Sequence, residues 1–557
     1  MSTYSNLINP PVSPNPVLSP APGREDAQVQ NNTGGFVFSV TPENRLLRFL
    51  VLGADSATYY ASKENHFRQA YEGVEKALIE LGVRAVEIIT EVSVAGRAPK
   101  QDATLFALAL CAAKGTPEVR AAAIQSINKV CRIPTHLFSF LTDYKALGGK
   151  TGGRAIKRSL QSWYLEKTPA SLAYSLVKYR HRGGWEHKDV LRLCKPVPGT
   201  LVEHGDLFRW AVGKPVILDN RLHMQLIFAH EAAKDDNLSD KDLAELVTKF
   251  GLPREGIPDA RLSSPEVWRA LLLPSPKEKG GMPLTALIRN LNRMTIAGLF
   301  GPNSAETMYA VSRLTDREEI KKARVHPIQF LSAARTYANG RGEKGSLTWE
   351  PNPQIIAALE TGFVLAFDFV ERTNKRYYIG LDVSGSMGSG DITGVPGLTP
   401  RDASAAMAML WSKTEPACVV KGFTSDGSGF WSNSTTLTDL TSVFLRDSLQ
   451  KCIAGVSDLP FGGTQPALII EDALKNKIPV DVFVILTDNE VNSGEHPFKK
   501  LQEYRKVMGI DAKMVVIGMT ATEFTLADPN DAGMLDVVGF DAAAPSVVSD
   551  FVTGDSK

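Results

Sequence analysis

The chain has 557 residues, of which 43% are hydrophobic and 22% are charged. These values are ordinary for globular protein, and the length allows two or three domains. No run of about 18 apolar residues occurs, so we expect no transmembrane helix. The N-terminus lacks the charged and apolar segments of a secretory signal. Five scattered cysteines form no CxxC pair, which excludes a zinc ribbon and a disulfide framework. Thiols of this kind suit a reducing compartment, and we expect a cytoplasmic protein.

The net charge of +1 hides an asymmetry between the two parts of the chain. Residues 351–557 carry 16 basic and 26 acidic residues, a net charge of −10. Residues 1–350 carry a net charge of +11, and residues 121–200 alone contain 14 basic and 4 acidic residues. The asymmetry points either to a polyanionic partner for the basic stretch or to docking of that stretch on the acidic part of the same chain.

The first two thirds of the chain are predicted to be helical. Residues 1–33 are rich in Pro, Ser and Asn, which predicts a disordered tail. Residues 34–372 then contain apolar or amphipathic segments separated by Pro and Gly. In Leu284–Met294, apolar residues recur at the i, i+3, i+4, i+7 spacing of a helix face. Further helices are expected over Arg45–Tyr60, Arg68–Val83 and Thr104–Ala113. Irregular helix pairs of this kind favour a HEAT-like α-solenoid.

From residue 373 onward the pattern changes to alternating strands and helices. Short runs rich in Val and Ile are bounded by helical stretches such as Ala403–Lys413 and Ala467–Lys475. Such alternation predicts a parallel sheet with helices on both faces, a doubly wound, Rossmann-like α/β domain over residues 373–557. The expected strands are Arg376–Leu381, Ala417–Phe423, Val480–Leu486 and Ala512–Met519.

Oxygen-bearing side chains follow two of these expected strands. Asp382, Ser384 and Ser386 form a DxSxS turn after the first strand, and Gly385 gives that turn backbone freedom. Thr464 lies in a later Gly-rich loop, and Asp488 follows the third strand. Hard oxygen ligands with only two carboxylates suit Mg²⁺, which keeps some water and accepts a ligand from a partner. No general base or nucleophile is evident beside them, and we expect His496 to cap a helix or line a loop.

Cations and aromatic side chains alternate in Tyr174–Lys195, which offers phosphate contacts and stacking surfaces for unpaired bases. Read as a helix, this segment places Lys178 and Arg182 on one face, and likewise Lys188 and Arg192, with Gly183-Gly184 as a break between the pairs. For any single cation a solvated helix face is the competing interpretation. The second basic set, around Arg324, is equally compatible with RNA contact and with cations at a helix C-terminus. The predicted RNA-binding residues are Arg132, His136, Lys157, Arg158, Lys178, Arg180, Arg182, His187, Lys188, Arg192, Arg289 and Arg324.

Long ordered motifs in this sequence closely resemble the Ro autoantigen family, in which a TROVE module precedes a von Willebrand factor A-like domain. The matching stretches are NNTGGFVFSV, RFLVLG, RIPTHLF, KYRHRGGWEHKDVLRL, MPLTALIRNL, DVSGSM, FGGT, TDNE and MLDVVGFD. The DxSxS turn, the later Thr and the later Asp resemble the metal-ion-dependent adhesion site of A domains. One departure is Gln465, where family members commonly have Asp. The motif sequences DVSGSM and MLDVVGFD are similar to those of bacterial members.

The resemblance implies a ring of HEAT-like helices whose ends are joined by the A-like domain. It implies a monomer that binds small non-coding Y RNAs on the outer surface, through positions matching Lys178, Arg182 and His187. It further implies binding of the single-stranded 3′ ends of misfolded structured RNAs, a role in RNA quality control and stability, and no enzymatic activity. An exoribonuclease or another protein is the expected partner at the metal site.

Two other functions remain open from the residues alone. One is a metal-dependent protein-adhesion module whose basic region docks on its own acidic domain. The other is a metal-dependent nuclease, which would need a positioned carboxylate or His beside the metal.

Overall fold

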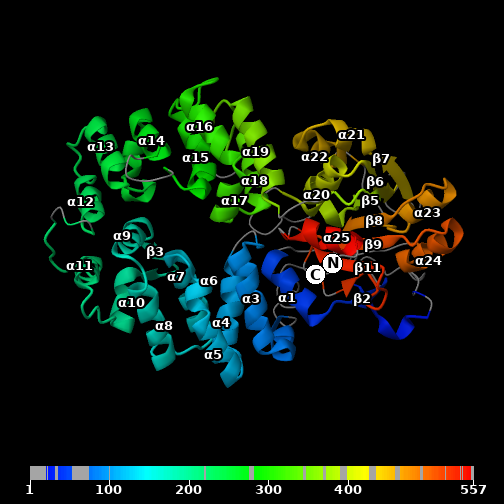
Figure 1. Ribbon diagram of the computed structural model, residues 1–557, viewed down its shortest axis with the longest axis horizontal. Helices are drawn as coiled ribbons and strands as arrows, with labels where there is room; N and C mark the ends of the chain where they lie inside the picture. The colour runs from blue at the N-terminus through cyan, green and yellow to red at the C-terminus, as the bar shows by residue number, and fades with distance from the viewer. Residues whose placement is uncertain are drawn as a thin grey trace, which may run out of the picture. The chain divides into compact units, whose positions relative to one another are not determined.

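The computed structural model divides into two compact units, which we call the helical unit (residues 82–96 and 101–366) and the α/β unit (residues 1–81, 97–100 and 367–557). Figure 1 shows the elements of both units. No helix among the described residues is long and apolar enough to cross a membrane. The structure describes residues 21, 23–31, 35–52, 74–98, 101–218, 221, 223–274, 281–342, 346–367, 372–388, 398–425, 435–457, 459, 464–489, 494–520, 522, 524–539, 541 and 543–553.

The helical unit is built from short helices that start at prolines and at hydroxyl caps. Pro occupies the first turn of several helices, where its missing N–H costs nothing. Thr116, Thr168, Ser239 and Ser304 each accept a hydrogen bond from a first-turn N–H. The helices are α3 (Val83–Ala95), α4 (Asp102–Lys114), α5 (Pro117–Gln125), α6 (Ile127–Val130), α7 (Pro134–Ala146), α8 (Arg154–Leu165), α9 (Pro169–Lys178), α10 (His187–Cys194), α11 (Val202–Ala211), α12 (Gln225–Ala232), α13 (Asp240–Phe250), α14 (Pro265–Leu272), α15 (Leu284–Ile296), α16 (Ala305–Leu314), α17 (Arg317–Ala323), α18 (Pro327–Ala338) and α19 (Pro353–Leu365).

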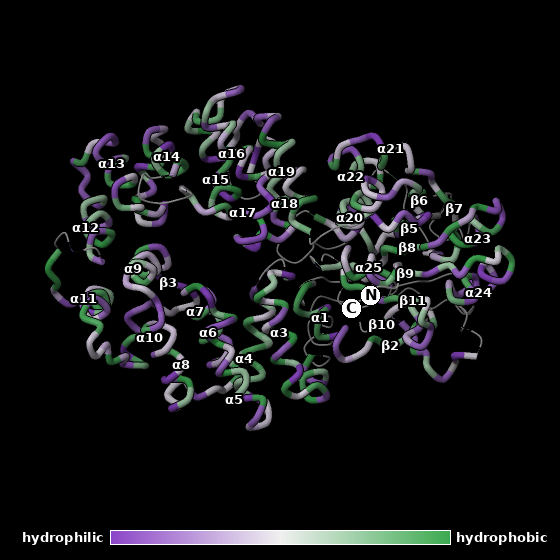
Figure 2. The backbone as a smooth tube through the Cα atoms, viewed as in Figure 1, coloured by the Kyte–Doolittle hydropathy of each residue, from purple (hydrophilic) through white to green (hydrophobic). Residues whose placement is uncertain are grey.

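These helices pack as neighbours along the chain, each burying an apolar face. α4 packs on α7, α13 on α14, and α18 on α19. Figure 2 shows hydrophilic and hydrophobic residues alternating along the helices, as an amphipathic array requires. The predicted helices Thr104–Ala113 and Leu284–Met294 correspond to α4 and α15. The expectation of a helical module is therefore confirmed.

A two-stranded hairpin interrupts the helices between α9 and α10. β3 (His181–Arg182) pairs with β4 (Trp185–Glu186) around Gly183 and Gly184, whose φ angles are +55° and +79°. Positive φ at both central residues is the geometry of a two-residue hairpin turn, and glycine adopts it without strain. The helical interpretation that put Lys178 and Arg182 on one face is therefore wrong, because the chain has left the helix by Arg182.

The α/β unit contains a six-stranded sheet with the order β11-β9-β8-β5-β6-β7, parallel except for β7. The four predicted strands match β5, β6, β8 and β9, and the expected helices match α20 and α23, so the α/β expectation is confirmed. The strands are β5 (Arg376–Asp382), β6 (Ala417–Ser425), β7 (Thr435–Asp439), β8 (Val482–Thr487), β9 (Lys513–Gly518) and β11 (Met534–Val538). The helices are α20 (Pro400–Thr414), α21 (Thr441–Arg446), α22 (Leu449–Ser457), α23 (Leu468–Lys475), α24 (Pro497–Met508) and α25 (Ala544–Thr553).

The N-terminal segment belongs to the α/β unit, whereas we expected a disordered tail to residue 33 and helical-module residues after it. β1 (Gln28–Gln30) and β2 (Phe36–Ser39) form a three-stranded sheet with β10 (Phe524–Thr525), and α1 (Pro42–Leu52) packs on β11. The physical reason is strand pairing across almost 500 residues of sequence, which local composition does not reveal. Residues 1–20 of the expected tail, and 53–73 of the first expected helices, lie outside the described residues.

Candidate metal and nucleic-acid sites

The DxSxS turn lies where β5 ends, at the carboxyl edge of the sheet. Asp382 is completely buried, and its Oδ1 accepts a hydrogen bond from the backbone N–H of Ser384 at 3.0 Å. The Ser384 and Ser386 hydroxyl oxygens are 3.0 Å apart. Because the turn folds back on its own carboxylate, these three side chains gather in one small region.

The neighbouring strand β8 brings the second carboxylate to the same edge. β5 and β8 are parallel and in register, and the Thr487 hydroxyl at the end of β8 donates to Asp382 Oδ2 at 2.6 Å. Asp488, the next residue, is buried, and its carbonyl accepts from the Thr520 hydroxyl at 3.2 Å. Thr464 is also buried and lies four residues before α23, a helix that packs over β5. The rest of its FGGT motif, 461–463, lies outside the described residues.

The donor set fits a small, hard cation. Burial raises the pKa of Asp382, while hydrogen bonds from Ser384 and Thr487 and the charge of Arg401 oppose that rise. Arg401 donates to the carbonyl oxygens of Val383 and Ser384 at 3.2 and 2.8 Å, which stabilises the backbone of the turn. Two buried carboxylates with hydroxyls beside them are the ligands Mg²⁺ prefers. Within the described residues, no cluster of three or more His, Cys, Asp or Glu forms another candidate metal site.

His496 takes the capping role that we expected. It is the N-cap of α24, its Nδ1 accepts the N–H of Phe498 at 3.1 Å, and its ring packs edge-on against Phe38 at 5.4 Å. Burial lowers the pKa of His496 to about 3, so the ring is neutral. This histidine supports the fold.

Four of the predicted RNA-binding cations, Lys157, Arg158, Lys188 and Arg192, lie on adjacent helices, and we call them the α8–α10 surface. α8 and α10 are joined by the Gln161 side chain, which donates to the carbonyl of Cys194 at 2.7 Å. Arg158 and Arg192 are exposed, and among the described residues neither has a recorded ion pair. Lys188 pairs with Glu186 at 2.6 Å. The surface therefore carries more positive charge than its own acids neutralise.

A second group, Arg132, Arg182 and Arg324 around His136, draws on distant parts of the helical unit, and we call it the arginine group. Burial lowers the pKa of Arg132, and the charge of Arg324 lowers it further. Burial followed by the charges of Arg132 and Arg182 lowers the pKa of His136 to about 4. Arg324 is exposed and its Nε donates to the carbonyl of Val94 at 2.5 Å. Arg182 is exposed and 4.0 Å from Asp102. Cations whose charges lower one another's pKa favour an anionic ligand.

The remaining cations stand apart from these two groups. Lys178, at the end of α9, donates to the Tyr174 hydroxyl at 3.1 Å. Arg180 hydrogen-bonds His230 Nε2, whose other ring nitrogen contacts the carbonyl of Gly256 at 2.9 Å. Arg289 is exposed on α15.

His187 corrects one expectation, because the structure places it in the core. It is 5% exposed, and its Nδ1 is 2.9 Å from the Tyr164 hydroxyl. Its ring packs edge-on against Phe138 at 5.1 Å, and burial lowers its pKa to about 4. The sequence does contain the signal for this burial, because His187, Val190, Leu191 and Cys194 follow the i, i+3, i+4, i+7 spacing of an inward helix face. Arg154 and Lys195, which belong to the same basic stretch of the sequence, are exposed at the start of α8 and just after α10. Their positions beside Gly153 and Pro196 are the sequence signal that marks them as helix-end cations.

Comparison with known proteins decides the family. The Ro60 von Willebrand A domain model matches residues 376–552, and the TROVE domain model matches residues 29–214 and 249–375. The chain belongs to the Ro60 family. This Ro60-family chain is 38% identical over 546 residues to a Deinococcus radiodurans protein named RNA-binding protein RO60, covering 97% of this chain and 98% of the relative.

Two further comparisons agree with that assignment. A Caenorhabditis elegans protein, also named RNA-binding protein RO60, is 36% identical over 609 residues, covering 95% of this chain and 91% of the relative. The crystal structure of the Deinococcus radiodurans RO (RSR) protein matches with a TM-score of 0.65 and 37% sequence identity, covering 92% of this chain and all of that one. The predicted family is therefore confirmed over nearly the whole length of the chain.

Proposed function

We propose that this chain binds RNA through the exposed cations of its helical unit and does not act as an enzyme. The observation that carries the proposal is the α8–α10 surface, where Arg158 and Arg192 lie on helices that pack together and pair with no acidic side chain among the described residues. Phosphates release condensed counterions when such cations neutralise them, which is the main source of RNA affinity. The relatives' name, RNA-binding protein, supports the same function.

The proposed ligands are a small non-coding Y RNA and the single-stranded 3′ ends of misfolded structured RNAs. The helical unit has two separate cationic groups, the α8–α10 surface and the arginine group. One group can therefore bind the structured part of one RNA, while the other binds the unpaired part of another RNA. Single strands offer both phosphates and base faces, whereas a duplex offers mainly shape and phosphates. The resulting ribonucleoprotein acts in RNA quality control and stability. Five buried free cysteines suit the reducing cytoplasm as its compartment.

The test replaces Arg158 and Arg192 together by Gln and measures filter binding of a Y-type RNA over a range of salt concentrations. Each lost phosphate contact removes about 0.7 to 0.9 from the slope of log affinity against log salt, so the double variant loses about 1.5. The matched control is Lys475→Gln with Lys506→Gln, two exposed cations of the α/β unit. Equal slopes for both double variants and the parent protein would show that the α8–α10 surface does not contact RNA.

The edge of the sheet that carries Asp382 and Asp488, which we call the metal edge, supports a second, compatible function. This function is the docking of a protein partner. Mg²⁺ bound by Asp382, Ser384, Ser386, Thr464 and Asp488 would supply a Lewis-acidic position that accepts a carboxylate from a partner such as an exoribonuclease. The alternative, that the basic region serves only to dock on the acidic unit, predicts that Asp382→Ala abolishes protein capture and that the Arg158→Gln, Arg192→Gln variant keeps full RNA affinity.

A further inference from the structure

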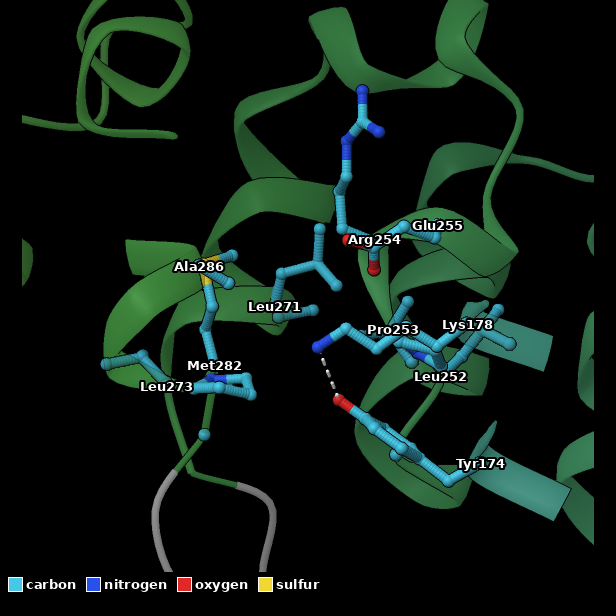
Figure 3. Close-up of a pocket in the computed structure, with 15 residues that line it drawn as sticks. Tyr174, Lys178, Leu252, Pro253, Arg254, Glu255, Leu271, Leu273, Met282 and Ala286 are labelled. Carbon is cyan, nitrogen blue, oxygen red and sulfur yellow. Dashed lines mark hydrogen bonds between the residues drawn. The ribbon is translucent and has the colours of Figure 1, made fainter. Parts of the chain in front are cut away.

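A half-open pocket lies inside the helical unit, between α9, α13, α14 and the start of α15 (Figure 3). Fifteen residues line this pocket, which is open to solvent on one side. Most of the wall is apolar, with Leu252, Leu271, Met282 and Ala286 among its members. Apolar side chains of this kind can cover the faces of a flat ring.

Lys178 puts one positive charge into this apolar space. Figure 3 shows its nitrogen meeting the Tyr174 hydroxyl between the two walls, and the two atoms are 3.1 Å apart. The same nitrogen lies 5.2 Å from the ring centre of Tyr174 and 5.4 Å from that of Tyr179. No ion pair is recorded for Lys178 in the described part of the chain. An ammonium group has three N–H bonds and the hydroxyl takes one, so two can donate to a ligand.

The rim of the pocket carries a local excess of positive charge. Arg254, which lines the mouth, lies 2.7 Å from Asp259, and Arg293 of α15 lies 3.7 Å from the same carboxylate. Asp259 therefore pairs with two guanidinium groups, and Glu255 is the other acid at the pocket, against Lys178, Arg254 and Arg293. Arg289 is exposed on the same helix, about one turn before Arg293. An anionic group is thus favoured at the rim, next to an apolar interior.

We propose that this pocket receives one unpaired nucleobase of the bound RNA, with the adjoining phosphate on Arg254 and Arg293. The apolar walls cover the base faces, and Lys178 donates to a carbonyl or ring nitrogen at the base edge. Glu255, also at the pocket, accepts from an N–H at the base edge, such as the ring N3–H of uracil. The inference rests on the proposed function and names a recognition subsite within it.

The first experiment locates the base. An oligouridine of about 12 nucleotides containing 4-thiouridine is bound to the full chain, irradiated, and the cross-linked peptides are identified by mass spectrometry. Cross-links to the peptides that hold Tyr174 or Met282 are expected. Cross-links confined to α8 and α10 would overturn the pocket while leaving RNA binding intact. Absence of any RNA binding would overturn the proposed function and the pocket with it.

The second experiment separates the base from its phosphate. Ala286→Phe fills the pocket without removing a charge, so affinity for the same oligouridine falls by about tenfold and the salt slope does not change. Lys178→Met keeps the wall apolar and lowers affinity without filling the space. The matched control is Ala305→Phe at the exposed start of α16, which keeps full affinity. The inference would be overturned if Ala286→Phe and Lys178→Met both kept full RNA affinity and melted at the same temperature as the parent protein.

Discussion

The predicted site residues differ in burial, and some lie in the core while others lie on the surface. Arg158 and His187 both follow helix-compatible patterns in the sequence, yet one is exposed and the other has its ring between Phe138 and Tyr164. The cations around His187 suggested an exposed ring, whereas its spacing to Val190, Leu191 and Cys194 on the eight-residue α10 is that of the buried face. Asp382 and Asp488 of the predicted metal site were easier to bring together, since the carboxyl ends of neighbouring parallel strands meet at one edge of a sheet.

The buried histidine gives the first prediction, a pH dependence of stability. The pKa of His187 is lowered to about 4, so in an acidic solution the unfolded chain takes up a proton that the folded chain does not. Stability is therefore complete above the unfolded pKa of about 6.5 and falls as the pH drops toward 4, at up to about 1.4 kcal/mol per pH unit from this group. Replacing His187 by Gln removes that part of the slope, which urea unfolding at pH 7 and pH 5 would measure. An identical pH slope in the variant would contradict the buried, neutral ring.

Whole elements were predicted with unequal success. The strands β5, β6, β8 and β9 begin or end within about two residues of their expected bounds, because buried parallel strands are short, continuous apolar runs. The hairpin β3–β4 was missed because two adjacent glycines can break a helix or build a turn, and only the φ angles decide. The strand β1 was missed because Gln28–Gln30 is polar and gains its structure from pairing with β2.

The N-terminal segment is held to the α/β unit by a buried arginine, which gives a prediction about α1. Arg48 is 1% exposed and donates to the carbonyl oxygens of Thr522 and Phe524 at 2.7 and 2.8 Å and to Asp536 at 2.6 Å. Arg48→Met leaves that nearly buried carboxylate without its cation, at a cost of about 3–5 kcal/mol. The matched control is Lys451→Met, because its pair with Asp447 is exposed and contributes well under 1 kcal/mol. Denaturant midpoints would compare them, and equal small losses would show that Arg48 does not anchor the segment.

At the scale of the whole molecule, opposite net charges accompany the two kinds of fold. Residues 351–557 carry a net charge of −10 and hold both the parallel sheet and the metal edge, while the basic stretch 121–200 lies in the helical unit. An acidic unit repels RNA and attracts cations, and a basic helical array does the reverse. This division of charge favours the proposed metal site in the α/β unit and the proposed RNA sites in the helical unit, so we expect the two functions to be separable by mutation.

The separation is testable with Asp382→Asn, a change that keeps shape and removes one buried charge. Without metal, Asp382 pays a desolvation cost, so in chelator the variant unfolds at a temperature equal to or above that of the parent protein. With excess Mg²⁺ the parent gains stability by mass action, about 2.7 kcal/mol at one hundred times the dissociation constant, and the variant gains little. RNA affinity, measured by filter binding, stays equal in the two proteins under both conditions. If the melting temperature of the parent protein does not change with Mg²⁺, the metal does not bind at this edge. If the variant loses RNA affinity, the two units share one binding function.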